Sequence, residues 1–209
     1  MASVDDGFSR HLARIVEELG LSLSGEQFAL LEGHYATLQR WNRKINLTAI
    51  RDPAEIAERH FGESLFLARE LGASPASLLD VGSGAGFPGM PVAVCHPTCE
   101  VSLLEPVGKK FAFLKEISRS IPNVSVLQGR LRDVEGTFEW ATIRGVAVIP
   151  ILAELVTRAR HLGILTTQRA VGEIRLAGGI AWEKQLILPW GNQRVLLVGQ
   201  SSSDRPRST

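Results

Sequence analysis

The sequence predicts an α/β fold in which helices come first, followed by a mostly parallel seven-stranded sheet that ends in an antiparallel hairpin. Two observations predict it. Apolar residues recur at helical spacing through the first 72 of the 209 residues, and from residue 77 short apolar runs alternate with helical stretches. We expect a helical extension over residues 1–72 that packs on the core, a core domain over 73–200 and a flexible tail over 201–209.

The predicted helical extension has clear helix boundaries. Ser24 and Gln27 form a Ser-x-x-Gln capping box at the start of one helix. Asp52 begins another, because an aspartate cap there precedes Pro53, and proline is favoured at the first helical position. That helix is expected to end at Gly72, since glycine commonly ends helices in a left-handed conformation.

Seven apolar runs are the predicted strands. Five of them alternate with helix candidates, among them 109–121 and 150–160, which indicates parallel strands joined by helices. These five runs cover residues 78–81, 101–104, 124–127, 140–143 and 164–166. Two further runs, 181–188 and 195–198, are joined by a short turn without a helix, which predicts the closing antiparallel hairpin.

Composition and charge exclude several classes of protein. A hydrophobic fraction of 44% is that of a packed chain, and a net charge of +1 leaves nucleic-acid binding to a local basic patch. The first ten residues lack the pattern of a signal peptide, and the longest apolar run, 145–156, is too short to span a bilayer. Cys95, His96 and Cys99 lack a fourth zinc ligand, and two cysteines cannot build a disulfide framework. We therefore expect a cytoplasmic protein without a metal.

The strongest local signal is a glycine-rich loop after the first predicted strand. Residues 78–89 read Leu-Leu-Asp-Val-Gly-Ser-Gly-Ala-Gly-Phe-Pro-Gly, in which Gly82 begins a run of alternating glycines and Pro88 opens a helix. Glycines let the backbone turn sharply and approach a ligand closely. Ligands of open α/β sheets bind beyond the carboxyl ends of the strands, so this loop is the predicted ligand site.

Two cofactors compete for this loop. Gly84, Gly86 and Gly89 satisfy G-x-G-x-x-G, the dinucleotide pattern, which on its own is weak evidence. Asp80, however, lies two residues before the first glycine, where it would meet the ammonium group of S-adenosylmethionine (SAM) directly or through water and would sit poorly beside a pyrophosphate. Phe87 puts a bulky ring where the dinucleotide pattern, counted from the first glycine, requires its third glycine. SAM is therefore favoured, and an NAD-linked oxidoreductase remains the alternative.

Glu105 supports the same site. It ends the second predicted strand and so should lie beside the glycine loop at the same edge of the sheet. A carboxylate there can accept hydrogen bonds from both ribose hydroxyls of an adenosyl group. Because NAD carries the same ribose, Glu105 does not separate the two cofactors.

A set of further motifs surrounds the loop between about Trp41 and Arg144. In order, they are Trp41-Asn42, Asn46-Leu47-Thr48, Arg59-His60, Glu63-Ser64, Phe87-Pro88-Gly89, Leu103-Leu104-Glu105, Lys109-Lys110, Phe113-Leu114 and Gln128-Gly129-Arg130. With them the chain resembles the GidB (RsmG) family of bacterial small-subunit ribosomal RNA guanine-N7 methyltransferases.

The resemblance implies a class I SAM-dependent methyltransferase with a Rossmann-like sheet. Its implied reaction is methyl transfer to N7 of a guanine in the 530-loop region of 16S ribosomal RNA, on the small ribosomal subunit. No catalytic side chain is expected, because guanine N7 carries a free lone pair and needs only to be aligned with the methyl group. A monomer is favoured.

The resemblance also implies cofactor contacts at particular positions. Gly82 and Phe87 are expected to contact SAM, Leu131 and Arg132 to lie against its adenine, and Arg144 to border the pocket. Relatives usually carry glutamate where this chain has Arg132, and a lysine of a later strand is missing. A non-catalytic SAM- or ribosome-binding relative is therefore a further alternative.

Basic residues near the motifs are the candidates for RNA binding, since phosphate contacts dominate such affinity. They are Arg40, Arg43, Lys44, Arg51, Arg59, Lys109, Lys110, Arg130, Arg132 and Arg144. His60 lies on the inward face of its helix, where it is either a core histidine or a substrate contact.

Overall fold

The computed structural model describes residues 6–191 and 193–202. Within these ranges, no helix is both long and apolar enough to cross a membrane. The predicted tail, 201–209, lies outside the described residues from position 203 onward.

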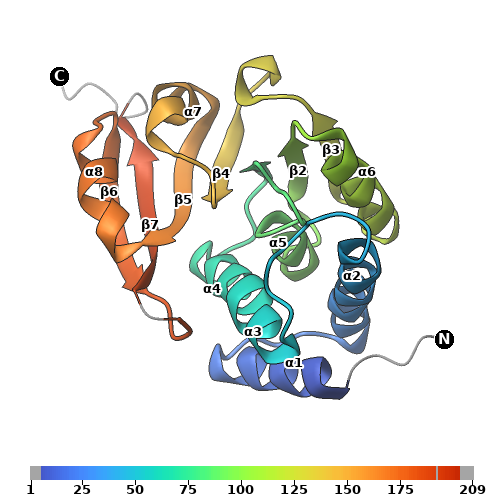
Figure 1. The fold of residues 1–209 in the computed structure, drawn as a ribbon. Helices are drawn as coiled ribbons and strands as arrows, with labels where there is room; N and C mark the ends of the chain where they lie inside the picture. The colour runs from blue at the N-terminus through green and yellow to red at the C-terminus, as the bar shows by residue number, and fades with distance from the viewer. Residues whose placement is uncertain (1–5, 192, 203–209) are drawn as a thin grey trace.

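A seven-stranded sheet forms the centre of the protein, in the order β3-β2-β1-β4-β5-β7-β6 (Figure 1). The strands are β1 (Ser77–Val81), β2 (Glu100–Glu105), β3 (Val124–Gln128), β4 (Phe138–Arg144), β5 (Ala159–Thr167), β6 (Ile180–Ile187) and β7 (Arg194–Ser201). Strands β1 to β5 pair in parallel, and β7 lies antiparallel between β5 and β6. This confirms the predicted α/β fold with its antiparallel C-terminal hairpin.

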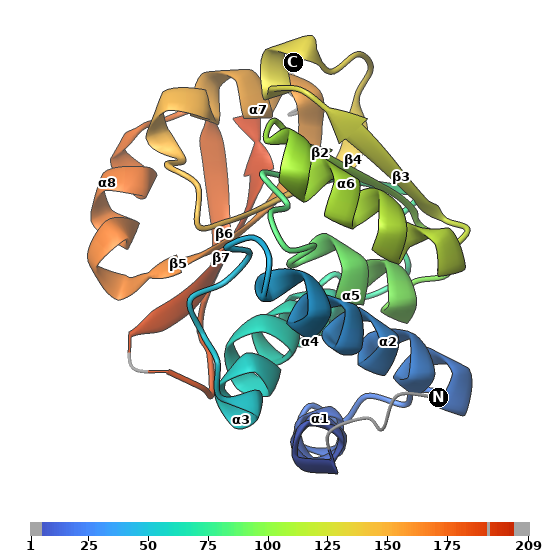
Figure 2. The same ribbon diagram turned by 45° about the vertical axis from the view of Figure 1, so that its right-hand side comes forward.

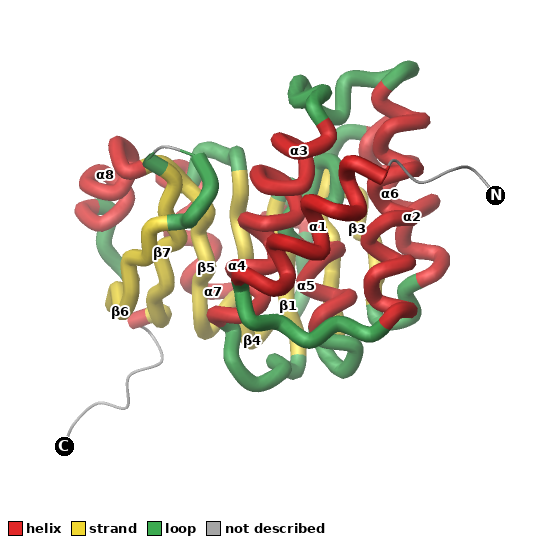
Figure 3. Tube along the Cα trace, turned by 90° about the horizontal axis from the view of Figure 1, so that it is seen from below, coloured by secondary structure: helices red, strands yellow, loops and turns green. Residues whose placement is uncertain are grey.

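Helices cover both faces of the sheet. The α-helices are α1 (Asp6–Glu18), α2 (Gly25–Asn42), α3 (Pro53–Ile56), α4 (Glu63–Glu70), α5 (Gly89–Cys95), α6 (Gly108–Ile117), α7 (Leu152–Arg158) and α8 (Val171–Leu176). Short 3-10 or π turns are η1 (Ala57–Gly62), η2 (Ser118–Ser120), η3 (Leu131–Asp133), η4 (Ile149–Ile151) and η5 (Gln168–Ala170). Side chains of α1 to α6 build one apolar core, and side chains of η3, α7 and α8 build a second on the other face (Figures 2 and 3).

The helix boundaries follow from the caps that the sequence predicts. The Ser24 hydroxyl accepts a hydrogen bond from the Gln27 amide at 3.2 Å, and the Gln27 side chain accepts one from the Ser24 amide at 2.8 Å. Asp52 Oδ1 accepts from the Glu55 amide at 2.9 Å and so begins α3. Gly72 follows α4 with a φ of +71°.

The fifth strand is longer than the apolar run predicts. The run at 164–166 is the end of a nine-residue strand that begins at Ala159 and includes Arg160 and His161. The His161 ring stacks on Trp140 of the neighbouring strand β4, with centroids 5.0 Å apart. A polar side chain thus gains a cross-strand partner, which an apolar run alone does not reveal.

Candidate functional site

The glycine loop leaves β1 at the carboxyl edge of the sheet. Gly82, Gly84 and Gly86 all have positive φ angles, of +73°, +57° and +85°, which other residues rarely adopt. The Gly82 amide donates to the Leu104 carbonyl of β2 at 2.9 Å. The loop therefore lies where the ends of β1 and β2 meet, as the sequence predicts.

Asp80 lies beneath this loop and is fully buried. Its Oδ2 accepts from the Gly89 amide at 3.0 Å, and its Oδ1 accepts from the Thr142 hydroxyl at 3.2 Å. Burial raises the pKa of Asp80 to about 6, against the lowering effect of these hydrogen bonds. Both oxygens are thus engaged inside the protein, and in this geometry the carboxylate connects β1 to the start of α5. Neither the Gly89 nor the Thr142 contact follows from the sequence pattern.

Gly89 is required by close packing rather than by its backbone conformation. A Cβ at this position would lie 2.3 Å from Leu103 Cδ2 and 2.8 Å from Asp80 Oδ2. The last glycine of the G-x-G-x-x-G pattern therefore serves the contact between helix α5 and strands β1 and β2. That role is common to nucleotide-binding folds and does not select NAD.

Glu105 lies beside the glycine loop, as its position at the end of β2 predicts. Its buried carboxylate accepts from the Gly84 amide through Oε2 and from the Val107 amide through Oε1, both at 2.9 Å. Each carboxylate oxygen has a second lone pair, so ribose hydroxyls can still be accepted. Val107, next to it, exposes an apolar side chain at the same edge.

Phe87 is a core residue. Its ring is stacked between His34 and His60, with centroids 4.6 Å and 4.8 Å away, and meets the edge of Phe61 at 5.0 Å. The expected SAM contact at this position would therefore come from the Phe87 backbone. The stack also fixes the glycine loop against the N-terminal helices, because His34 Nε2 donates to the Ala85 carbonyl at 2.8 Å.

The two histidines of this stack are neutral. Burial lowers the pKa of His34 to about 4. Burial, with Arg144 as the next cause, lowers the pKa of His60 to about 2. Of the two interpretations open for His60, the structure supports a core histidine.

We expect acid to destabilise the fold through these histidines. Both have folded-state pKa values below the unfolded value of 6.5, so each histidine lowers the free energy of unfolding by roughly 2 kcal/mol as the pH falls from 8 to 5. The raised pKa of Asp80 offsets part of this loss, by roughly 1 kcal/mol, because its carboxyl group takes up a proton over the same pH range. Urea unfolding should therefore show a net loss of about 2–3 kcal/mol at pH 5.

A matched variant tests the assignment. The amide of His34→Gln can still donate to the Ala85 carbonyl but cannot titrate, so most of the pH-dependent loss should disappear. An unchanged pH profile in this variant would show that His34 does not carry the effect.

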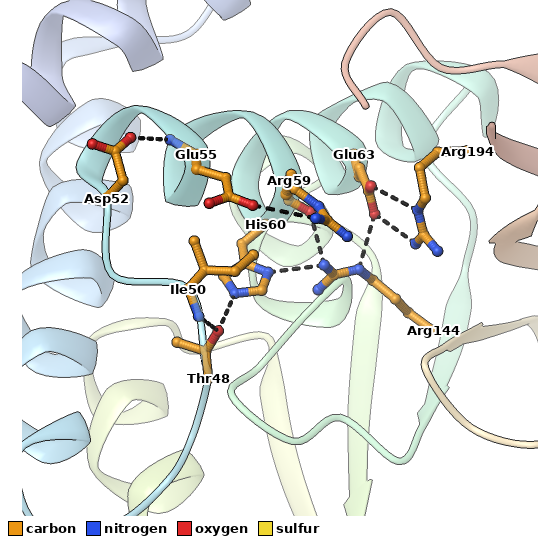
Figure 4. Close-up of polar contacts among 9 residues, drawn as sticks. All are labelled: Thr48, Ile50, Asp52, Glu55, Arg59, His60, Glu63, Arg144 and Arg194. Atoms are coloured by element: carbon orange, nitrogen blue, oxygen red, sulfur yellow. Dashed lines mark hydrogen bonds and ion pairs between the residues drawn. The ribbon is translucent and has the colours of Figure 1, made fainter. Parts of the chain in front are cut away.

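Arg144 ends β4 and points toward the helices (Figure 4). Its Nε donates to Glu63 Oε2 at 3.0 Å, and one Nη donates to the Arg59 carbonyl and to His60 Nδ1, both at 2.8 Å. Arg194, at the start of β7, donates to both oxygens of Glu63 at 2.9 Å. The buried Glu63 therefore joins α4 to the ends of two strands, a network that sequence spacing does not reveal.

Leu131 and Arg132 lie in η3, just after β3. Leu131 is buried in the second core, whereas the Arg132 side chain is 70% exposed and lies 3.8 Å from Asp133. The structure thus places Leu131 near the edge occupied by Glu105, because β2 and β3 pair in parallel up to Glu105 and Gln128. The Arg132 guanidinium extends into solvent.

Val146 lies against the glycine loop, a contact that the sequence analysis did not predict. It belongs to the loop after β4, and a Cβ added to Gly82 would lie 2.4 Å from its Cγ2. The absence of a side chain at Gly82 therefore leaves space for the Val146 side chain, which belongs to the loop after the neighbouring strand β4. Only the apolar character of the segment after Gly145 could have indicated it.

Comparison with known proteins identifies the family. Residues 27–192 match the model of the family described as GidB, rRNA small subunit methyltransferase G. The ribosomal RNA small subunit methyltransferase G of Roseiflexus castenholzii is 40% identical over 78% of this chain and 62% of that protein. The one of Chloroflexus aggregans is 38% identical, over 69% of this chain and 64% of its own length. The one of Streptococcus pyogenes serotype M1 is 32% identical over 92% of this chain and 91% of that protein.

Solved structures agree on the fold. A magnesium protoporphyrin IX methyltransferase from Synechocystis with bound SAM superposes with a TM-score of 0.64 at 12% identity, over 87% of this chain and 99% of that one. A SAM-dependent methyltransferase from Aquifex aeolicus superposes with a TM-score of 0.59 at 17% identity, over 72% of this chain and 94% of that one. These likenesses show the class I methyltransferase fold. By the family match and the identities above, the chain belongs to the GidB, or rRNA small subunit methyltransferase G, family.

Proposed function

We propose that this protein transfers a methyl group from SAM to N7 of a guanine in the 530-loop region of 16S ribosomal RNA. The observation that carries the proposal is the glycine loop after β1, with Glu105 bonded to the Gly84 amide beside it. Family membership supports the reaction class and the ribosomal RNA substrate. A small-subunit substrate would place the protein in the cytoplasm.

The residues at the sheet edge fit SAM. The glycines at 82 and 84 expose backbone in a conformation that brings a ligand close, Glu105 can accept from the ribose, and Val107 offers an apolar surface to the adenine. SAM supplies an electrophilic methyl group when bound. The remaining contribution of the chain is to hold acceptor and donor in line and to exclude water.

No general base is required for this reaction. Guanine N7 presents its lone pair in the ring plane, so no proton has to be removed before attack. The nearby buried acids, Asp80 and Glu105, hold the loop through hydrogen bonds and have no part in proton transfer in this proposal.

The two alternatives make different predictions for binding. An NAD-linked oxidoreductase would bind NAD at the same loop, and a non-catalytic relative would bind SAM without transferring its methyl group. Calorimetry with SAM and NAD in parallel should show SAM binding alone. If the protein bound NAD and not SAM, the result would reject the proposal and favour an NAD-linked oxidoreductase.

Transfer of tritium-labelled methyl groups tests the reaction itself. With SAM labelled in the methyl group and small subunits from a strain lacking this methylation, we expect label in 16S ribosomal RNA at a guanine N7. Label on another base would overturn the assigned atom, and SAM binding without any transfer to RNA or subunits would favour the non-catalytic relative.

A further inference from the structure

A groove with a cavity volume of about 520 Å³ lies between helix α6 and the end of α2 with the residues just after it. Its lining consists of three cations, two apolar side chains and one carboxylate, namely Arg40, Lys44, Lys109, Trp41, Ile45 and Glu116. The two helices lie on the same face of the sheet (Figure 2). The structure thus brings together three of the ten basic residues that the sequence singled out.

The charge of this groove differs from that of the whole chain. The protein carries a net charge of +1, whereas the groove alone holds three cations against one carboxylate. Arg40 is paired with Glu116. Lys44 and Lys109 are exposed and form no ion pair with any residue in the described ranges. Their charges are therefore available to an anionic partner.

Trp41 gives the groove a rigid aromatic wall. Its indole Nε1 donates to Glu116 Oε2 at 2.9 Å, and its ring meets the edge of the buried Phe113 with centroids 5.8 Å apart. The ring is partly exposed and is held in one orientation by these contacts. An aromatic face beside cations is the arrangement that binds single-stranded nucleic acid, in which bases stack and phosphates meet positive charge.

The groove lies close to the cofactor loop. Helix α6 begins three residues after Glu105, whose carboxylate holds the Gly84 amide. On the other side, Asn42 at the end of α2 accepts from the amides of Leu47 and Thr48 at 2.9 Å and 3.1 Å. Thr48 in turn bonds to His60 (Figure 4). The His60 ring stacks on Phe87. Both walls are therefore connected to the loop where the methyl group would be transferred.

We propose that this groove binds a single-stranded segment of the RNA substrate next to the target guanine. Lys44 and Lys109 contact backbone phosphates, and one unpaired base stacks on Trp41 against Ile45. The inference rests on the proposed function and adds the place where the substrate strand leaves the reaction centre.

A charge-removal experiment tests the phosphate contacts. The double variant Lys44→Gln with Lys109→Gln should raise the KM for stripped small subunits and leave kcat at saturating substrate and the SAM affinity unchanged. It should also reduce the slope of log affinity against log salt concentration by about 1.4, because each of the two lost phosphate contacts contributes roughly 0.7. The matched control is Lys115→Gln with Arg119→Gln. Lys115 of α6 and Arg119 of η2 are both exposed, and neither lines the groove. Equal effects of the two double variants would overturn the proposal.

The tryptophan separates stacking from charge. Trp41→Leu should weaken RNA binding by about tenfold, whereas Trp41→Phe, which keeps an aromatic face, should retain most of the affinity. The comparison stays informative if the leucine variant folds poorly. If the phenylalanine variant, shown to be folded, binds as weakly as the leucine variant, no base stacks at this position.

Glu116 gives a prediction of opposite sign. Its carboxylate faces the phosphate path and neutralises Arg40, so Glu116→Gln should bind RNA several-fold more tightly and show a steeper salt dependence. Weaker binding by this variant would contradict the proposed strand path.

These outcomes are distinguishable from failure of the proposed function. If the wild-type protein methylates small subunits and the groove variants behave as the control, the groove does not bind the RNA, while the proposed methyl transfer is supported. If the wild-type protein binds SAM but transfers no methyl group, the reaction is wrong, while direct RNA binding by the same variants still tests the groove.

Discussion

Replacing Glu63 by glutamine is expected to lower the free energy of unfolding by about 3–5 kcal/mol. The Glu63 side chain is completely buried and accepts hydrogen bonds from two arginines, Arg144 and Arg194, which are only 14% and 16% exposed. The amide cannot neutralise either guanidinium, so two buried positive charges would lose their partner. Because these arginines begin or end strands at the ligand edge, methyl transfer should fall with stability.

The control is a second ion-paired glutamate five residues earlier. Glu58 bonds to Arg14 at 2.8 Å, but the two side chains are 32% and 49% exposed, and such surface pairs contribute at most about 1 kcal/mol. Urea unfolding of Glu58→Gln and Glu63→Gln, analysed with the same dependence of the free energy of unfolding on urea concentration, measures the difference in stability between the two variants. A loss below 1 kcal/mol for Glu63→Gln would show that the buried network does not support the fold.

Replacing Gly82 by alanine is expected to reduce SAM affinity about tenfold or more. The φ of +73° is unfavourable for any side chain by about 1–2 kcal/mol, and the new methyl group would lie 2.4 Å from Val146 Cγ2. The free protein should relax by moving the loop, and SAM binding would have to restore it. Each 1.4 kcal/mol of that reorganisation lowers the affinity tenfold.

Two variants separate strain from collision. Gly136→Ala has the same kind of φ, +80°, with nothing within 4 Å of the new Cβ, so it should destabilise the fold mildly and leave SAM binding intact. Val146→Ala in the Gly82→Ala background removes the colliding methyl and should recover part of the affinity. Calorimetric titration with SAM measures the affinity of both variants. If Gly82→Ala bound SAM with the affinity of the wild-type protein, this glycine would not be at the cofactor site.

Local sequence rules predicted the positions of the glycine loop after β1 and of Glu105 at the end of β2. The glycine run needs positive φ angles, and Glu105 ends the strand next to β1, so both could be placed at one edge of the sheet from the sequence alone. The caps at Ser24 and Asp52 are similarly local. In each case the signal lies within a few residues of the feature.

The contacts that the sequence did not reveal join distant segments. Glu63 meets Arg144 and Arg194 across 81 and 131 residues, and Thr142 reaches Asp80 across 62. These pairings depend on how helices pack on the sheet, and no local pattern encodes them. The same reason explains why the sequence placed Arg144 at the end of β4 but did not reveal the hydrogen bonds of its guanidinium to Glu63 and His60.

A crystal structure of the protein grown with SAM would test the central claim most directly. We expect the nucleoside beyond the ends of β1 and β2, with its ribose hydroxyls bonded to Glu105 and its methionyl part against Gly82. SAM bound elsewhere, or a glycine loop without SAM at saturating SAM concentration, would contradict this account.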